Sequence, residues 1–197
     1  MSSTAIDYAD VQGTLLRGYR VDMARHFVLN ITSAAKAGAF IAGLADGTGG
    51  LPRITTAARW KVKPECFVNV AFTAAGLTAL GVPAQQLATF DQGFQRGATN
   101  PVTAQTVGDV GDSAPANWIA GLANGAAVHL ILSLWVDDDS AVLEKVTATL
   151  RAAFEKPRRF EFCDGSCCRD EQGFLTEAAR KAVLEEFDHD FPEAQHG

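Results

Sequence analysis

The stretch FVNVAFTAAGLTALGVP, residues 67–83, decides the fold. Its first part, 67–72, is apolar except for Asn69 and rich in β-branched and aromatic residues, which favours a buried strand over a surface helix. Thr73 then offers an oxygen that can cap a helix, and good helix formers follow it. Gly81 and Pro83 end that helix. The stretch therefore predicts a core unit made of a strand, a sharp turn and a short helix.

The segments on either side of this unit continue the same pattern of strands and helices. Apolar residues recur at strand spacing in some segments and at helix spacing in others. Thr32 or Ser33 can cap the first helix, and Asp137 to Asp139 can cap the last one. The order is strand, helix, strand, strand, helix, strand, which predicts an α+β fold with the ferredoxin-like βαββαβ arrangement. The expected strands are 24–32, 67–72, 128–136 and 159–163, and the expected helices are 34–45, 74–80 and 140–154.

Three further segments complete the expected domain organisation. A short edge strand is expected at 54–61, and a long insertion with little regular structure at 85–127, anchored by Phe90, Phe94 and Trp118. The chain changes character after Asp164. We therefore expect one domain over 1–163, and a second segment over 164–197 that holds a cysteine-containing turn and a C-terminal helix at 174–187.

The composition restricts the possible partners and compartment. The chain has 197 residues, of which 47% are hydrophobic, and a net charge of −6. That charge argues against nucleic-acid binding, which needs a basic surface. No apolar run is long enough to span a membrane, and the N-terminus lacks the features of a secretion signal. We therefore expect a soluble cytoplasmic protein without nucleic-acid or membrane partners, whose cysteines stay reduced.

Three motifs, in this order along the chain, resemble segments of one protein family. They are DVQGTLLRGY at 10–19, VNVAFTAAGLTALGVP at 68–83 and GDVGDSAPANW at 108–118. Together they resemble the N-terminal half of the DyP-type (dye-decolorizing) peroxidases, over about residues 7–154. The resemblance implies a ferredoxin-like domain, haem as the cofactor and peroxide-dependent oxidation as the activity.

The same resemblance implies that haem lies mainly in a second half, which supplies a distal Asp within G-x-x-D-G, a proximal His and a distal Arg. The closest match is EFCDG at 161–165, where Asp164 would be the catalytic distal acid although Glu161 replaces the first Gly. Asp164 and Gly165 are also a common turn pair at the end of a strand. The 32 residues after Gly165 contain only two histidines, so the family's haem ligands are not identifiable. Haem chemistry is then expected only if a haem-bearing partner chain or self-association supplies the missing half.

A cysteine cluster follows the last expected strand. Cys163, Cys167 and Cys168 have a spacing that permits metal binding, to zinc or another ion. A fourth ligand could be Cys66, His189 or Asp164. The alternatives are free thiols or a redox-active pair.

Three functions therefore compete: one half of a haem peroxidase, a haem-free redox or metal-binding protein, and a non-catalytic scaffold. In all three, we interpret His26 and His129 as core residues with satisfied hydrogen bonds. The uncovered face of the sheet predicts a homo-oligomer or a hetero-complex. Its apolar surface is expected around Phe94, Trp118 and Trp135.

Overall fold

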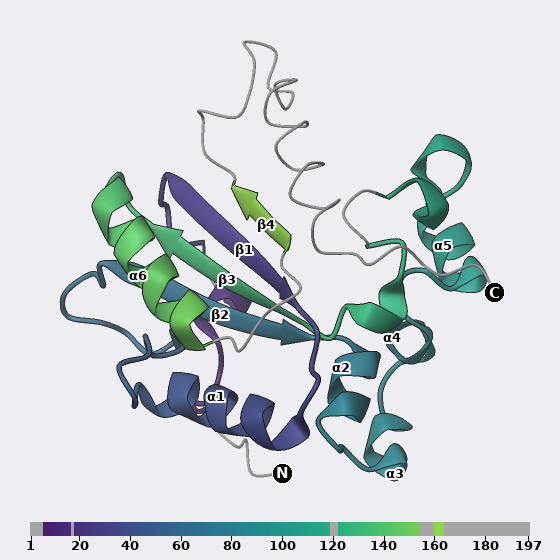
Figure 1. The fold of residues 1–197 in the computed structure, drawn as a ribbon, viewed down its shortest axis with the longest axis horizontal. Coiled ribbons are helices and arrows are strands. Elements are labelled where there is room, and N and C mark those ends of the chain that lie inside the picture. The colour runs from purple at the N-terminus through teal and green to yellow at the C-terminus, as the bar shows by residue number, and fades with distance from the viewer. Residues whose placement is uncertain (1–5, 17, 119–121, 154–159, 164–197) are drawn as a thin grey trace.

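The structure, a computed structural model, describes residues 6–16, 18–118 and 122–153, together with the backbone of 160–163 (Figure 1). The expected second segment, 164–197, lies outside the described residues. The strands are β1 (Met23–Leu29), β2 (Cys66–Phe72), β3 (Leu130–Val136) and β4 (Phe160–Cys163). The α-helices are α1 (Ala34–Asp46), α2 (Ala74–Ala79), α3 (Ala84–Leu87), α4 (Gln92–Arg96), α5 (Pro101–Val107) and α6 (Ser140–Ala153). The 3₁₀ turns are η1 (Gly13–Leu15), η2 (Gly111–Ser113), η3 (Pro115–Asn117) and η4 (Gly125–Ala127).

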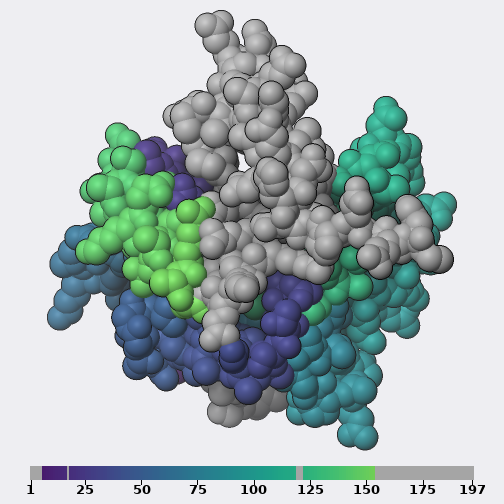
Figure 2. Space-filling view, in the orientation of Figure 1, coloured from purple at the N-terminus to yellow at the C-terminus, as the bar shows by residue number. Residues whose placement is uncertain are grey.

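The four strands form one antiparallel sheet in the order β2-β3-β1-β4. This order places the first and third strands at the centre, as the ferredoxin-like arrangement requires. Helices α1 and α6 lie on the same side of the sheet, where their side chains form much of the molecular surface in Figure 2. The ferredoxin-like α+β fold expected from the sequence is confirmed. No helix within the described ranges is long and apolar enough to cross a membrane.

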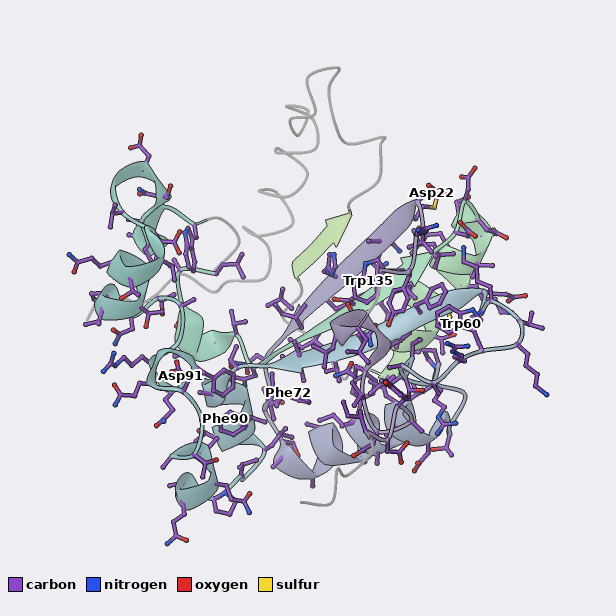
Figure 3. The ribbon with its side chains drawn as sticks, turned by 180° about the vertical axis from the view of Figure 1, so that it is seen from behind. Asp22, Trp60, Phe72, Phe90, Asp91 and Trp135 are labelled. Atoms are coloured by element: carbon purple, nitrogen blue, oxygen red, sulfur yellow. The ribbon has the colours of Figure 1, made fainter. Side chains whose placement is uncertain are left out.

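Successive side chains along each strand point to opposite sides of the sheet, so that the sheet has a core face and an open face. On β3, Leu130, Leu132, Leu134 and Val136 are buried and join the hydrophobic core under the helices. The intervening residues point to the opposite side, which no described α-helix covers (Figure 3). The N-terminal segment and Trp60 pack over part of it, at Phe67. We call this side the open face. Its residues on the first three strands are Ala24, His26 and Val28 from β1, Phe67, Asn69 and Ala71 from β2, and Ile131, Ser133 and Trp135 from β3.

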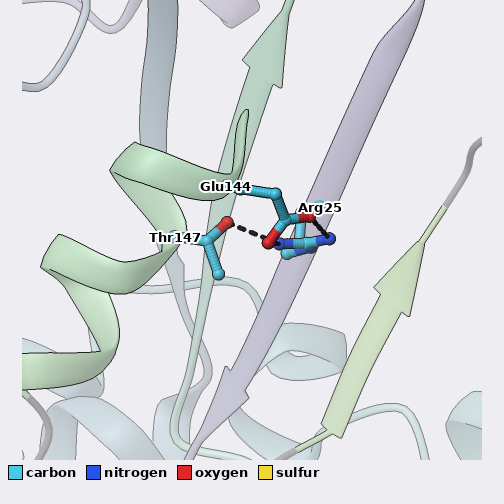
Figure 4. Close-up of polar contacts among 3 residues, drawn as sticks. All are labelled: Arg25, Glu144 and Thr147. Atoms are coloured by element: carbon cyan, nitrogen blue, oxygen red, sulfur yellow. Dashed lines mark hydrogen bonds and ion pairs between the residues drawn. The ribbon is translucent and has the colours of Figure 1, made fainter. Parts of the chain in front are cut away.

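A polar contact on the core face fixes α6 to the sheet (Figure 4). Arg25 on β1 donates from Nη1 to the hydroxyl of Thr147 at 2.7 Å and from Nη2 to Glu144 Oε1 at 2.8 Å. The side chain of Arg25 is only 11% exposed, whereas that of Glu144 is 62% exposed. The guanidinium therefore reaches through the edge of the core, and its charge is met by a carboxylate on the surface of the helix.

Two sequence-based expectations outside the sheet are wrong. The segment 54–61 does not form an edge strand; its described β contact is an isolated bridge between Gln12 and Thr56. The insertion is not largely irregular, because α3, α4, α5 and three 3₁₀ turns follow one another along it. Each of these helices is at most seven residues long. Such short helices carry too little apolar periodicity to be recognised in the sequence.

The helix before the insertion is capped as the sequence predicts. Thr73 accepts a hydrogen bond from the N–H of Gly76 at 2.9 Å, which caps α2. The helices that follow, α3 to α5, lie beyond the end of the sheet where β2 ends and β3 begins (Figure 1). The rings of Phe90 and Phe94 are in tilted contact with their centroids 4.9 Å apart, but Phe90 stays 44% exposed and is a weaker anchor than expected.

Candidate functional site

The N-terminal segment is attached to the outer edge of β2 by the side chain of Gln12, whose amide bonds to the β2 backbone as a neighbouring strand would. Gln12 Oε1 accepts a hydrogen bond from the N–H of Val70 at 2.8 Å, and Gln12 Nε2 donates to the carbonyl of the same residue at 2.8 Å. Asn69 donates to Gln12 Oε1 at 3.1 Å and to the Thr55 carbonyl at 3.2 Å. Together these bonds satisfy buried polar groups that would otherwise destabilise the edge.

An aromatic cluster lies on the open face next to this edge (Figure 3). Tyr19 stacks on Phe67 with the ring centroids 4.3 Å apart and meets Trp135 edge-on at 5.5 Å. His26 contacts the other side of Trp135 at 5.8 Å, and Trp60 contacts Phe67 at 5.5 Å. Aromatic rings favour stacked and edge-to-face contacts of this kind. The cluster makes the open face apolar at its centre.

Polar groups on the open face are paired with one another. The phenol of Tyr19 donates to Asn69 Oδ1 at 2.6 Å, and both residues are buried. His26 Nδ1 lies 2.8 Å from the hydroxyl of Ser133. Because these groups already have partners, the open face can lose water without leaving charges or unpaired polar groups behind.

The contacts of the N-terminal segment with the sheet explain several residues of the motif at 10–19. Gly13 has no room for a side chain, because a Cβ atom there would lie 2.8 Å from the Tyr19 hydroxyl and 2.9 Å from the Thr56 carbonyl. Among the apolar residues of this motif, Tyr19 is buried and anchors the segment on the sheet. In contrast, Leu15 and Leu16 are 71% and 52% exposed. The roles of Gln12 and Asn69 were missed, and the only signal for them was the motif itself.

The motif at 108–118 forms a compact turn in the insertion. Trp118 Nε1 donates to the Ser113 carbonyl at 2.9 Å, and Asn117 Nδ2 donates to the Gly111 carbonyl at 3.1 Å. Trp118 therefore packs within its own loop. Phe94 packs against Phe90 and Trp135 against Tyr19, and no described ring contact joins Phe94, Trp118 and Trp135. The expectation of one apolar surface around these three residues is not supported, since each makes its main contacts in a different cluster.

Most of the sequence-predicted chemical residues lie outside the described part of the chain. Asp164, Cys167 and Cys168 lie outside the described residues. Cys163 is described only as a backbone position of β4, where it pairs with Arg25. Among the described residues, no group of three or more His, Cys, Asp or Glu side chains could hold a metal ion. Cys66, a suggested fourth ligand, is half-buried on the core face, and burial raises the pKa of its thiol, with Glu65 adding to the shift. A thiol of this kind is a poor metal ligand.

The described residues do not fit a haem site. Of the four histidines, only His26 and His129 lie in the described ranges. His129 uses both ring nitrogens in hydrogen bonds to the backbone of Ile31 and Ala126, and His26 is bound to Ser133. Both have hydrogen-bond partners, as expected, but each is half-buried and neither belongs to the core. A cavity of about 260 Å³ lies between the N-terminal segment and the chain after α1, but no histidine or cysteine lines it. Haem needs an axial ligand, and the lining of this cavity offers none.

Comparison with known proteins places these features in a family. A family model described as the DyP dimeric α+β barrel domain matches residues 10–161. The dye-decolorizing peroxidase msp1 of Mycetinis scorodonius is 29% identical over 167 residues, which cover 81% of this chain and 30% of that protein. The crystal structure of DyP has a TM-score of 0.66 at 19% identity, covering 88% of this chain and 37% of the other.

A further solved structure, of a dye-decolorizing peroxidase whose heme pocket was engineered for asymmetric sulfoxidation, has a TM-score of 0.60 at 20% identity. It covers 84% of this chain and 34% of the other. At these identities the two structural matches show the fold alone. The chain spans about a third of the length of the relatives it matches.

Proposed function

Because the chain belongs to the DyP-type peroxidase family, whose N-terminal part it matches, we propose that it is the α+β domain of a haem-dependent peroxidase. In this proposal it takes part in peroxide-dependent oxidation when it is assembled with a haem-bearing part. The observation that carries the proposal is the family match over residues 10–161, together with the ferredoxin-like strand order. One solved relative is a peroxidase with a heme pocket, which supports haem as the cofactor.

The haem ligands in this proposal come from outside residues 6–153. His129 has both ring nitrogens hydrogen-bonded to the backbone, and the ring of His26 packs edge-on against Trp135, so the proposal assigns the axial ligand to neither. The task of the described domain is therefore to bind and position the haem-bearing part. In this proposal, a haem-bearing segment that is not part of these 197 residues provides it.

The open face is the surface that the proposal assigns to this assembly. Its aromatic centre and its paired polar groups suit a face that becomes buried. The family model describes a dimeric barrel domain, which supports association through such a sheet. A second sheet laid on the open face would complete a barrel-like core, with Ile131 and Trp135 at the contact.

Haem titration of the purified chain tests the first half of the proposal. We expect no stoichiometric Soret band when haemin is added, and no peroxide-dependent dye oxidation. The dye-decolorizing peroxidase of M. scorodonius is the positive control. A stoichiometric Soret band with dye oxidation by the chain alone would show that it carries its own haem site. This result would reject the proposal that the haem ligands come from elsewhere.

Complementation tests the second half. The chain is co-expressed with the portion of the M. scorodonius enzyme that lies outside the matched region. We expect the pair to show haem absorption and dye oxidation that neither part shows alone. Ile131→Glu, on the open face, should abolish the gain, whereas Val107→Glu, on the exposed side of α5, should retain it. Equal activity with both variants, or none with the unaltered chain, would reject the role assigned to the open face.

A further inference from the structure

The cavity of about 260 Å³ lies where the N-terminal segment meets the chain that follows α1. One wall consists of residues 9–12, and the other of the end of α1 and residues 53–56. The Ala57 N–H donates to the Val11 carbonyl at 2.7 Å, and an isolated β-bridge pairs Gln12 with the 53–56 segment. The two walls are therefore hydrogen-bonded to each other, and the cavity does not depend on side chains alone for its shape.

Arg53 is held at the cavity wall by the end of α1. Its Nε donates to the Ala45 carbonyl at 3.1 Å, and the N–H of Ile54 donates to the Leu44 carbonyl at 2.7 Å. These carbonyls belong to the last turn of the helix, where they have no partner within the helix itself. Because only Nε is used, both Nη groups of the guanidinium are without a hydrogen-bond partner among the described residues.

Asp10 brings a negative charge to the same cavity. The preceding turn is closed by Asp7, which accepts from the Ala9 N–H at its Oδ1 and from the Asp10 N–H at its carbonyl. The Asp10 carboxylate itself forms no hydrogen bond or ion pair with a described residue, and Arg53 is no exception. Both side chains are exposed, so that a ligand can reach them from solution. The cavity thus offers two opposite charges that do not neutralise each other.

The rest of the lining is mostly small and apolar, and it includes Ala9, Val11, Ala45 and Ile54. The amide of Gln12 is already bound to the β2 backbone and does not compete for a ligand. A guanidinium binds a carboxylate through two parallel N–H bonds, and a carboxylate accepts hydrogen bonds from an ammonium group. The volume lies below the range that is typical for drug-sized ligands. The lining therefore fits a small molecule with both charges and a short apolar body.

We propose that this cavity binds a small zwitterion of the α-amino-acid class, with Arg53 on its carboxylate and Asp10 on its ammonium group. A short apolar side chain of the ligand contacts Val11 and Ile54. The bound zwitterion joins the N-terminal segment to the chain after α1. None of the lining residues belongs to the open face, so the site is separate from the proposed assembly surface.

An NMR titration of the purified chain with L-valine, isobutyrate and isobutylamine tests the proposal. The three probes share a branched apolar body, but isobutyrate lacks the ammonium group and isobutylamine lacks the carboxylate. For valine we expect saturable shifts of the amides at 9–12 and 53–57, with a Kd of about 1 mM, as for a ligand of few heavy atoms. Each of the other two should bind about tenfold more weakly, because it loses a charge-assisted hydrogen bond. No saturable shift with valine, or equal binding of all three probes, would overturn the proposal.

Four variants assign the binding to the two charges. Arg53→Gln keeps a donor for the Ala45 carbonyl but loses the guanidinium, and Asp10→Asn loses the carboxylate. Each should weaken the binding of valine about tenfold. The matched controls are Arg59→Gln and Asp22→Asn, at exposed residues outside the lining, which should bind valine as the wild type does. Unchanged binding in both cavity variants would overturn the proposal. If a cavity variant does not fold, the comparison of the three probes on the wild type decides.

Discussion

A side chain at position 76 would overlap with the carbonyl oxygen of His129, because α2 passes directly over the start of β3 there. Gly76 is buried and also donates to the Thr73 hydroxyl that caps the helix. The conformation at 76 is ordinary for a helix, so the need for glycine here is one of space. This differs from Gly47, where the left-handed C-cap of α1 requires glycine for its backbone conformation.

We expect Gly76→Ala to lower the free energy of unfolding by about 1–3 kcal/mol, as overpacking of a rigid backbone does. Gly38→Ala is the matched control, because position 38 also lies in a helix but a Cβ atom there would meet no other atom. Gly38→Ala should raise stability by about 0.5–1 kcal/mol. Urea unfolding followed by circular dichroism measures both. Equal changes in the two variants would contradict the close approach at 76.

At the scale of the element, α6 depends on an ion pair whose strength varies with pH. Hydrogen bonding to Arg25 lowers the pKa of Glu144, with the charge of Arg25 adding to the shift. A carboxyl group whose pKa is lowered by folding stabilises the native state above its ordinary pKa, and this contribution is lost as the pH falls through the folded value. Acid should therefore weaken the attachment of α6 to β1.

Glu144→Gln provides the test of that attachment. The variant should be less stable than the wild type at about pH 7, and the difference should shrink as the pH falls below the ordinary pKa of a glutamate and the wild-type carboxylate becomes protonated. Asp22→Asn is the control, since Asp22 is exposed and forms no salt bridge with a described residue. Thermal unfolding across the pH range measures the effect. A difference that stays constant with pH would mean that the pair with Arg25 does not stabilise the helix.

The elements differ in how well the sequence predicted them, and the reason is length. The strands and α1, α2 and α6 have clear periodicity and cap residues, such as Ser33 and Asp139, whose side chains accept backbone hydrogen bonds. The helices α3 to α5 are too short for such a signal. The segment 54–61 has strand-like residues, but Thr55 meets β2 through a single backbone bond to Val68 and a side-chain contact, so no ladder forms.

The candidate site was harder to predict because it depends on contacts over long sequence distances. Tyr19 and Asn69 are 50 residues apart, and Gln12 and Val70 are 58 apart. Periodicity reports the neighbours of a residue along the chain and cannot identify such pairs. The family motif marked Gln12 and Tyr19 without giving their partners. Both described histidines have hydrogen-bond partners, as expected, although neither belongs to the core.

At the scale of the whole molecule, the uncovered sheet face leads to a prediction about assembly. We expect the purified chain to be a dimer at micromolar concentration, with twice the monomer mass of 20.9 kDa by light scattering. Ile131→Glu and Trp135→Glu would place a charge in the buried contact and should give monomers that keep the native circular dichroism spectrum. Val107→Glu, at a residue 65% exposed on α5, should remain dimeric.

A monodisperse wild-type monomer would contradict association of this chain with itself. The complementation experiment would then decide whether a different polypeptide occupies the open face. Dimers that persist in both open-face variants would place the contact elsewhere on the molecule. Each result therefore distinguishes a self-association through the sheet from the other arrangements.

The amide of Gln12 also determines how this protein avoids a common hazard of open sheets. An exposed strand edge is a template on which a foreign strand can add, and repeated addition leads to aggregates and cross-β fibrils. On the outer edge of β2, the N–H and carbonyl of Val70 are already occupied by Gln12. An incoming strand would have to displace this side chain first. The domain can thus present its sheet for pairing face to face while the β2 edge is closed to polymerisation.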